Sequence, residues 1–180
     1  MKHKSLIICL MAVAAALLAT CLTGCNSSGC TENRNALPLA EFYNSATGRA
    51  IGLDSLQISG VDAPGDSVLS APGPSITQVY LPMRPTETQT AWCIAYKWRE
   101  LDYPELNDTI TFDYQTEPYF ASEECGATYR YRITEMAYTE HLIDSVVIVD
   151  PLITNIDKAY FRIYFRGESD NPDNKPDQEL

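Results

Sequence analysis

The stretch ITFDY, at residues 110–114, decides the fold class. Its apolar and aromatic residues, Ile110, Phe112 and Tyr114, alternate with Thr111 and Asp113. Successive side chains of a β-strand point to opposite faces, so a period of two places the large residues together on one face. The stretch therefore predicts a strand with one face buried in a core and the other exposed to water.

The same period recurs along the chain, between turns rich in proline, glycine, asparagine and aspartate. It predicts further strands near residues 37–43, 51–58, 68–69, 76–81, 92–98, 129–134 and 159–165. Residues 146–149 are apolar on both faces, which is typical of a strand in the middle of a sheet. A sustained helical period is absent. We expect an all-β fold, an immunoglobulin-like antiparallel β-sandwich over residues 37–166, with a β-barrel as the alternative.

The first residues predict export followed by attachment to lipid. Lys2 and Lys4 precede an uncharged apolar run at residues 6–19, which is shorter than the roughly 20 residues of a transmembrane helix. The next motif, LTGC at residues 22–25, is similar to the bacterial lipobox. We expect a signal peptide at residues 1–24 and acylation of Cys25, for example with palmitate. Cys21 is the weaker alternative, because threonine rather than glycine precedes it. Each buried methylene contributes about 0.8 kcal/mol, so several acyl chains anchor a protein stably.

The net charge and length of the chain limit the classes of partner and the number of domains that we expect. The whole chain carries a net charge of −11, and removal of residues 1–24 takes away two lysines and no acid, which makes the net charge −13. A protein with this charge is a poor partner for nucleic acid. The remaining length suits one domain, flanked by a lipidated N-terminus and tether at residues 25–36 and a tail at residues 167–180. The tail is acidic with few apolar residues, so we expect it to be disordered.

Three cysteines remain after the lipidated one: Cys30, Cys93 and Cys125. In an oxidising compartment this number predicts one disulfide and one spare thiol. No two of them are close in sequence, and His141 is the one histidine after the signal peptide, which argues against a zinc site. We expect no metal and no cofactor.

Short motifs along the domain point to a family. They are Cys30 itself, FY at residues 42–43, LQISG at 56–60, LP at 81–82, ITFDY, Ser122 with CG at 125–126, and FRI at 161–163. Together they resemble an uncharacterised family of Bacteroidota cell-envelope lipoproteins, a domain of unknown function. The resemblance implies compartment and fold but no mechanism. It also implies that Cys30 and Cys125 are the recurring cysteines, and Cys93 departs from the pattern.

A Cys30–Cys125 disulfide would close a loop of almost 100 residues. The lost entropy of the unfolded chain would then stabilise the folded state by about 4 to 5 kcal/mol. Pairs with Cys93, or three reduced thiols, are the alternatives. If Cys30 is bonded to the folded body, residues 26–29 allow a reach of roughly 15 to 20 Å from the lipid. The stretch after Cys25 also lacks an acid-rich surface-export signal. We therefore expect the domain on the periplasmic face of the outer membrane, bound to the bilayer through acylated Cys25.

Two classes of function fit this location. His141 lies close to Glu140 and Asp144, and serines are plentiful, so a hydrolase acting on envelope glycan is the alternative hypothesis. A Gly-x-Ser-x-Gly motif is absent. We therefore expect a non-enzymatic structural or interaction module with an envelope protein or glycan as partner.

Seven basic residues lie in or beside three predicted strands, where they would hold an anionic glycan or a protein if those strands are neighbours: Lys97, Arg99, Arg130, Arg132, Lys158, Arg162 and Arg166. Period two places Tyr160 and Tyr164 on the face of Arg162 and Arg166. Cross-strand pairs with Glu100, Asp102 or Asp113 are the simpler and preferred interpretation.

Four sites resemble the Asp-Ser/Thr-apolar motif at which exported Bacteroidota proteins are O-glycosylated. Their acceptors are Ser55, Ser67, Thr109 and Ser145. We expect at least one of them to be modified in the host. Asp-Ser is also good turn chemistry before a strand, and the two interpretations are compatible.

Overall fold

The computed structural model describes residues 35–64, 67–98 and 100–167. The predicted signal peptide, Cys25, Cys30 and most of the tether and tail lie outside the described residues. No helix in the described part of the chain is long and apolar enough to cross a bilayer.

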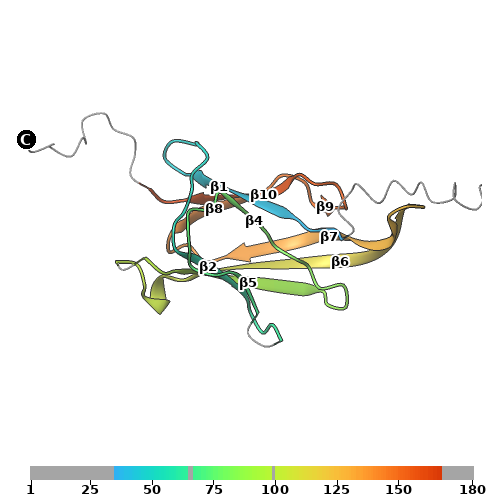
Figure 1. Cartoon of the computed structure of the whole chain (residues 1–180), viewed down its shortest axis with the longest axis horizontal. Coiled ribbons are helices and arrows are strands. Elements are labelled where there is room, and N and C mark those ends of the chain that lie inside the picture. The colour runs from blue at the N-terminus through green and yellow to red at the C-terminus, as the bar shows by residue number, and fades with distance from the viewer. Residues whose placement is uncertain (1–34, 65–66, 99, 168–180) are drawn as a thin grey trace, which may run out of the picture. The chain divides into compact units, whose positions relative to one another are not determined.

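The described strands form two sheets that face each other, as Figure 1 shows. The smaller sheet has four strands in the order β4-β1-β10-β8, and the larger has six in the order β3-β2-β5-β6-β7-β9. Their bounds are β1 Leu39–Asn44, β2 Leu56–Gly60, β3 Val68–Ser70, β4 Gln78–Tyr80, β5 Gln89–Tyr96, β6 Asp108–Ser122, β7 Gly126–Tyr138, β8 Ile143–Ile148, β9 Leu152–Ile153 and β10 Ala159–Phe165. A short 3-10 helix, Pro104–Leu106, precedes β6. The predicted β-sandwich is confirmed.

The core lies between the sheets and is built from the alternation of the sequence. Ile110, Phe112 and Tyr114 are at most 2% exposed. Phe112 of the larger sheet stacks on Phe161 of the smaller one, with ring centroids 4.4 Å apart. Fully burying a phenylalanine contributes about 1.5 to 3 kcal/mol, so this pair joins the two layers.

The smaller sheet departs from the sequence-based expectation in two ways. β1 and β10 pair in parallel, whereas we expected antiparallel neighbours throughout. β8 was expected in the middle of a sheet, yet it stands at the end of the strand order and pairs with β10. Its apolar character on both faces arises because Val147 faces outward and is 44% exposed.

A bulge changes the face of one aromatic residue. Leu39 pairs with Ala159 and Ala40 with Phe161, so Tyr160 is the extra residue between two register pairs. Its side chain is fully buried, and its hydroxyl lies 3.0 Å from the Thr154 hydroxyl. The expectation that Tyr160 shares the exposed face of β10 with the arginines is therefore wrong.

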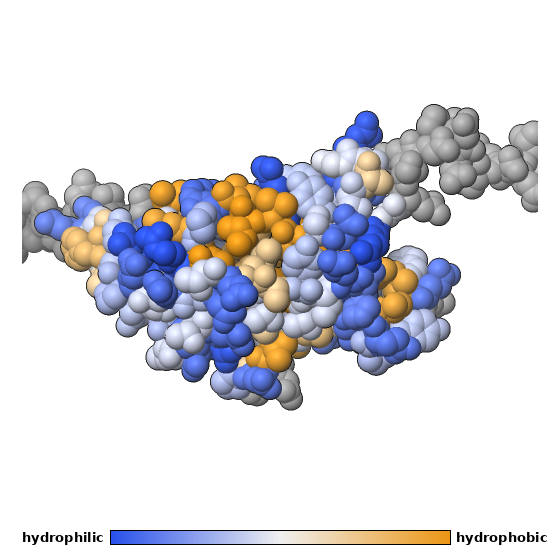
Figure 2. Space-filling view, turned by 180° about the vertical axis from the view of Figure 1, so that it is seen from behind, coloured by the Kyte–Doolittle hydropathy of each residue, from blue (hydrophilic) through white to orange (hydrophobic). Residues whose placement is uncertain are grey.

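Apolar residues also remain on the surface. Figure 2 shows hydrophobic residues gathered over the middle of one face, bordered by hydrophilic ones. Among the described residues, the large hydrophobic side chains with the highest exposed fractions are Phe120 at 64%, Ile156 at 54%, Tyr103 at 53% and Trp98 at 51%. Phe120 lies near the end of β6, and Trp98 follows the end of β5.

Candidate functional site

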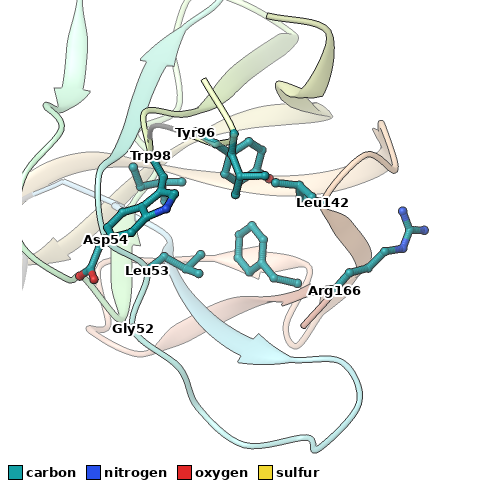
Figure 3. A pocket seen from close by; sticks show the side chains of 10 residues that line it. Gly52, Leu53, Asp54, Tyr96, Trp98, Leu142 and Arg166 are labelled. Carbon is teal, nitrogen blue, oxygen red and sulfur yellow. The ribbon is translucent and has the colours of Figure 1, made fainter. Parts of the chain in front are cut away.

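A cleft of about 320 Å³ lies at the end of the sandwich where β5 and β10 finish. Figure 3 shows side chains from both sheets and their connections converging on it. Leu53 and Asp54 come from the β1–β2 connection, Trp98 and Leu101 follow β5, and Leu142 precedes β8. The remaining lining residues are Gly52, Leu56, Tyr96, Phe165 and Arg166. The cleft is thus a mainly apolar opening with an acid and a base among its lining residues.

A buried carboxylate positions two of the walls. Asp108 is fully buried at the start of β6. The Tyr96 hydroxyl donates a 2.8 Å hydrogen bond to its Oδ2, and the Leu142 N–H donates one of 2.9 Å to the same atom. Both residues line the cleft, so one carboxylate fixes the end of β5 relative to the segment before β8.

Three further donors complete the shell of Asp108. Ile143 N–H lies 2.9 Å from Oδ2, and Oδ1 accepts from the Thr139 hydroxyl at 2.7 Å and from the His141 N–H at 2.9 Å. Burial by itself would raise the pKa of Asp108, but the backbone hydrogen bonds of His141, Ile143 and Leu142 and the Thr139 hydroxyl outweigh it and lower this pKa below its usual value. The carboxylate is therefore charged at neutral pH.

The tyrosine of this network is held protonated. Burial is the main cause that raises the pKa of Tyr96 far above its ordinary value, and the neighbouring Asp108 charge adds to it. A phenol that stays neutral remains a hydrogen-bond donor. The Tyr96–Asp108 hydrogen bond consequently persists over the physiological pH range and holds one wall of the cleft in place.

Arg166 occupies the other side of the opening. Its guanidinium donates to the carbonyl of Glu140 and, at 2.9 Å, to that of His141. It also lies 3.8 Å from the Glu140 carboxylate and 3.6 Å from that of Asp144. The acids that flank His141 in the sequence thus bind an arginine.

Trp98 separates the cleft from a second, more polar hollow of about 420 Å³, which is lined by Ser55, Lys97, Trp98 and Glu100. Ser55 has a positive φ of 53°, in the left-handed region that residues with a Cβ rarely adopt. Hydrogen bonds of its N–H to the Gly73 carbonyl and of the Lys97 N–H to its own carbonyl fix this conformation. Because Trp98 lines both hollows, its indole offers contact surface to each of them.

Asp108 and His141 form an acid–imidazole pair rather than a catalytic triad. His141 Nδ1 lies 3.3 Å from Asp108 Oδ1 and 3.0 Å from the Asn107 carbonyl oxygen. The hydroxyl that joins the pair is that of Thr139, and it donates to the carboxylate. No group of three potential metal ligands occurs within the described residues. The cleft offers apolar contact surface to a ligand, and the charged side chains of Asp54 and Arg166 stand at its border.

The basic residues do not make one patch. β5 and β7 belong to the larger sheet and are separated by β6, whereas β10 lies in the smaller sheet, so the strands expected to be neighbours are not. Lys97 pairs with Asp102 at 2.7 Å, but both residues lie in the connection after β5, so this is a contact within one loop and not the expected cross-strand pair. The other described members also face acids: Arg130 and Arg132 face Glu117, Lys158 faces Asp150, Arg162 faces Glu41, and Arg166 faces Glu140 and Asp144. Arg99 lies outside the described residues.

The predicted cysteine sites are only partly described. Cys93 is a free cysteine, whereas Cys125, at the tip of the β6–β7 hairpin, is not free. The Cys93 pairings therefore lose support. The expected partner of Cys125, Cys30, lies outside the described residues, as does Cys25, so both the pairing and the acylation stay predictions.

The four predicted glycosylation acceptors differ in accessibility. Ser67 is exposed just before β3, whereas Ser55, Thr109 and Ser145 are half-buried. Thr109 lies in β6 between two neighbouring strands, and its N–H donates to the Thr139 hydroxyl. Ser67 therefore offers the most accessible acceptor.

The comparison with protein families assigns the chain. The model of a family of unknown function, DUF6452, matches residues 55–165. The chain belongs to this family. The DUF6452 match spans β2 to β10 and includes Asp108 and Trp98. Neither the curated proteins nor the solved structures gave a match to the chain.

Sequence reasoning missed the two residues that organise the cleft. Asp108 entered only as part of an Asp-Thr motif, although it shares the parity of buried Ile110 and Phe112 and this parity indicates an inward side chain. Trp98 was predicted to be the last residue of a strand at residues 92–98. It stands two residues after the end of β5 and is 51% exposed.

Proposed function

We propose that this DUF6452 protein is a lipid-anchored, non-enzymatic interaction module of the bacterial cell envelope, whose partner binds at the cleft around Trp98. The observation that carries the proposal is a preformed apolar opening with a half-exposed tryptophan, in which Asp108 fixes the walls at Tyr96 and Leu142. Tryptophan is one of the residues that are enriched among the energetic hot spots of protein interfaces. The LTGC motif at residues 22–25 supports the anchor, and the periplasmic face of the outer membrane is the proposed location.

The cleft favours an apolar side chain of an envelope protein as its ligand. Leu53, Leu101 and Leu142 surround the opening, and Trp98 supplies a flat face. The charged border of Asp54 and Arg166 would orient the polar backbone around such a side chain. A glycan that stacks on the indole is the other ligand class, and the polar hollow with Lys97 and Glu100 would then receive its hydroxyls.

Cross-linking in the native host tests this proposal with the full chain. Wild type is compared with Trp98→Ala and with Val147→Ala, a matched control of similar exposure on the outer face of the smaller sheet. We expect a partner that wild type and Val147→Ala capture and Trp98→Ala does not. The purified partner should then bind Trp98→Ala about tenfold or more weakly, which is the usual loss at an interface tryptophan.

Three outcomes are distinguishable. Loss of the partner with Trp98→Ala alone supports the proposal. If the protein binds soluble envelope glycan and this binding depends on Trp98, the ligand of the cleft is a sugar and not a protein. Identical partners and affinities for all three proteins contradict a binding role for the cleft.

The Asp108–His141 pair is the observation that keeps the hydrolase alternative in view, because a carboxylate orients the imidazole in many hydrolases. A turnover screen on envelope glycans with wild type and His141→Ala separates the two classes. We expect the same background rate from both proteins. Glycan cleavage that His141→Ala abolishes would overturn the non-enzymatic proposal.

A further inference from the structure

The β6–β7 hairpin extends beyond the rest of the sandwich, and Figure 1 shows it curving at its far end. β5 pairs with β6 only as far as Asp113, and β9 pairs with β7 only at Tyr131 and Arg132. The two strands continue together from there to the turn before Gly126. The far half of the hairpin is therefore a two-stranded ribbon.

This ribbon has two unlike faces. Pro118 and Phe120 share the face of buried Tyr114, and they pair with Tyr129 and Ala127 across the ribbon. These four residues form the apolar strip. Phe120 is 64% exposed and Tyr129 is 45% exposed, so the strip continues the core stripe into a region where no described strand covers it.

The opposite face is occupied by polar contacts. The Arg130 guanidinium lies 2.7 Å from the Glu117 carboxylate and 5.5 Å from the centroid of the Tyr119 ring. This face satisfies its own charges. The ribbon is therefore amphipathic, with one face suited to water and one suited to an apolar surface.

The described chain begins beside this strip. A hollow of about 330 Å³ is lined by Asn35, Ala36 and Leu37 together with Tyr129 and Tyr131. Nine residues lie between Cys25 and Asn35, so ten residue-to-residue steps join them, and an extended chain of ten steps spans at most about 35 Å. An acylated Cys25 would thus hold the bilayer within reach of the ribbon.

We propose that the apolar strip of the ribbon rests in the interface of the bilayer to which the protein is anchored, so that Phe120 and Tyr129 contact phospholipid. The inference rests on the proposed lipid anchor at Cys25. Aromatic side chains favour the interface between water and hydrocarbon, where an apolar ring meets polar headgroups. The anchor brings the strip to lipid, and the strip fixes the orientation of the sandwich.

The acidic turn of the hairpin favours a lipid without net charge. The turn carries exposed Glu123 and Glu124, and the net charge of the mature chain is strongly negative. An anionic surface would repel this end of the molecule. Zwitterionic phospholipid is therefore the partner that the strip fits.

The experiment places a photoreactive 4-benzoylphenylalanine at position 120 of the full-length acylated protein in phosphatidylcholine vesicles. The matched control carries the same residue at position 147, which is 44% exposed on the smaller sheet. Flotation with the vesicles and intact mass report the anchor independently. We expect several-fold more lipid adduct at position 120 than at 147, and less adduct when phosphatidylglycerol is added.

Other outcomes overturn the inference. Equal lipid adducts at both positions in protein that floats would overturn it and leave the anchor intact. Adducts from position 120 to residues 26–34 of the same chain, or to a second copy, would show that protein covers the strip. Protein that neither floats nor carries acyl chains would overturn the anchor and the inference together. Reaction with Phe120 intact and a photoreactive phosphatidylcholine repeats the test without a substitution in the ribbon.

Discussion

The two ends of the sandwich are held by different physics. At the cleft end, one buried carboxylate accepts five hydrogen bonds and fixes segments from β5, β6 and the β7–β8 connection. At the ribbon end, two strands pair only with each other, and an apolar face stays open. The first arrangement fixes the walls of a preformed cleft, whereas the second leaves apolar side chains exposed to solvent. The two proposals thus use opposite ends of one small domain: the cleft end to bind a partner, and the ribbon end to orient the domain on the membrane.

Among the changes at the two ends of the sandwich, removal of the Asp108 acceptor has the largest expected effect on stability. Asp108→Asn replaces one acceptor oxygen by an amide donor that faces donors, and we expect the free energy of unfolding to fall by about 2 to 4 kcal/mol. Urea denaturation measures the loss. Asp113→Asn is the control, because Asp113 is half-buried on the opposite face and its Oδ1 accepts one hydrogen bond from Gln89. An equal loss for both variants would contradict the special role of Asp108.

Acid should remove the same stabilisation. The pKa of Asp108 is lower in the folded protein than its usual value near 4, so its contribution is complete above about pH 4 and is lost as the pH falls through the folded pKa. The difference in unfolding free energy between wild type and Asp108→Asn should therefore be constant near neutral pH and shrink below about pH 4. A difference that grows on acidification would contradict this sign.

The ribbon should respond locally and weakly. Glu117→Gln breaks the contacts of Glu117 with Arg130 and Arg132, which are partly exposed, so we expect a loss of about 1 kcal/mol or less in global stability. Hydrogen exchange should quicken for ribbon amides and stay unchanged for those around Asp108. Exchange that quickens equally at both ends would show that the two regions unfold as one unit.

The smallest effect on stability is expected at the apolar strip. Phe120→Ser changes a side chain that is 64% exposed, so the midpoint of urea unfolding in solution should move within the range of ordinary surface substitutions, about 0.5 kcal/mol. Phe112→Ala, at a fully buried ring, is the control with an expected loss of about 3 to 5 kcal/mol. A large loss for Phe120→Ser would mean that the strip is part of the folded core.

Alternation predicted the layers well because the side chains of a strand obey a local rule. Ile110, Phe112 and Tyr114 are buried as their spacing indicates. Tyr160 escaped the rule because a bulge, set by pairing with β1, shifts its face. The edge position of β8 also escaped it, since strand order depends on partners far away in the chain.

The candidate site was harder to predict than the fold. The donors to Asp108 include Thr139 and Ile143, which are 31 and 35 residues away, and no local motif brings them together. The cleft likewise collects residues from the β1–β2 connection, β5, the segment before β8, and β10. A cavity between segments is a property of packing, and a sequence pattern indicates it only through exceptions such as an inward-facing aspartate.

The proposed anchor is tested most directly by Cys25→Ser expressed in the native host, with membrane fractionation and intact mass of the product. The account predicts that wild type floats with membranes and carries acyl chains on Cys25, whereas the variant is unacylated and leaves the membrane fraction. A variant that fractionates with membranes as wild type does, or a wild-type mass without acyl chains, would contradict it.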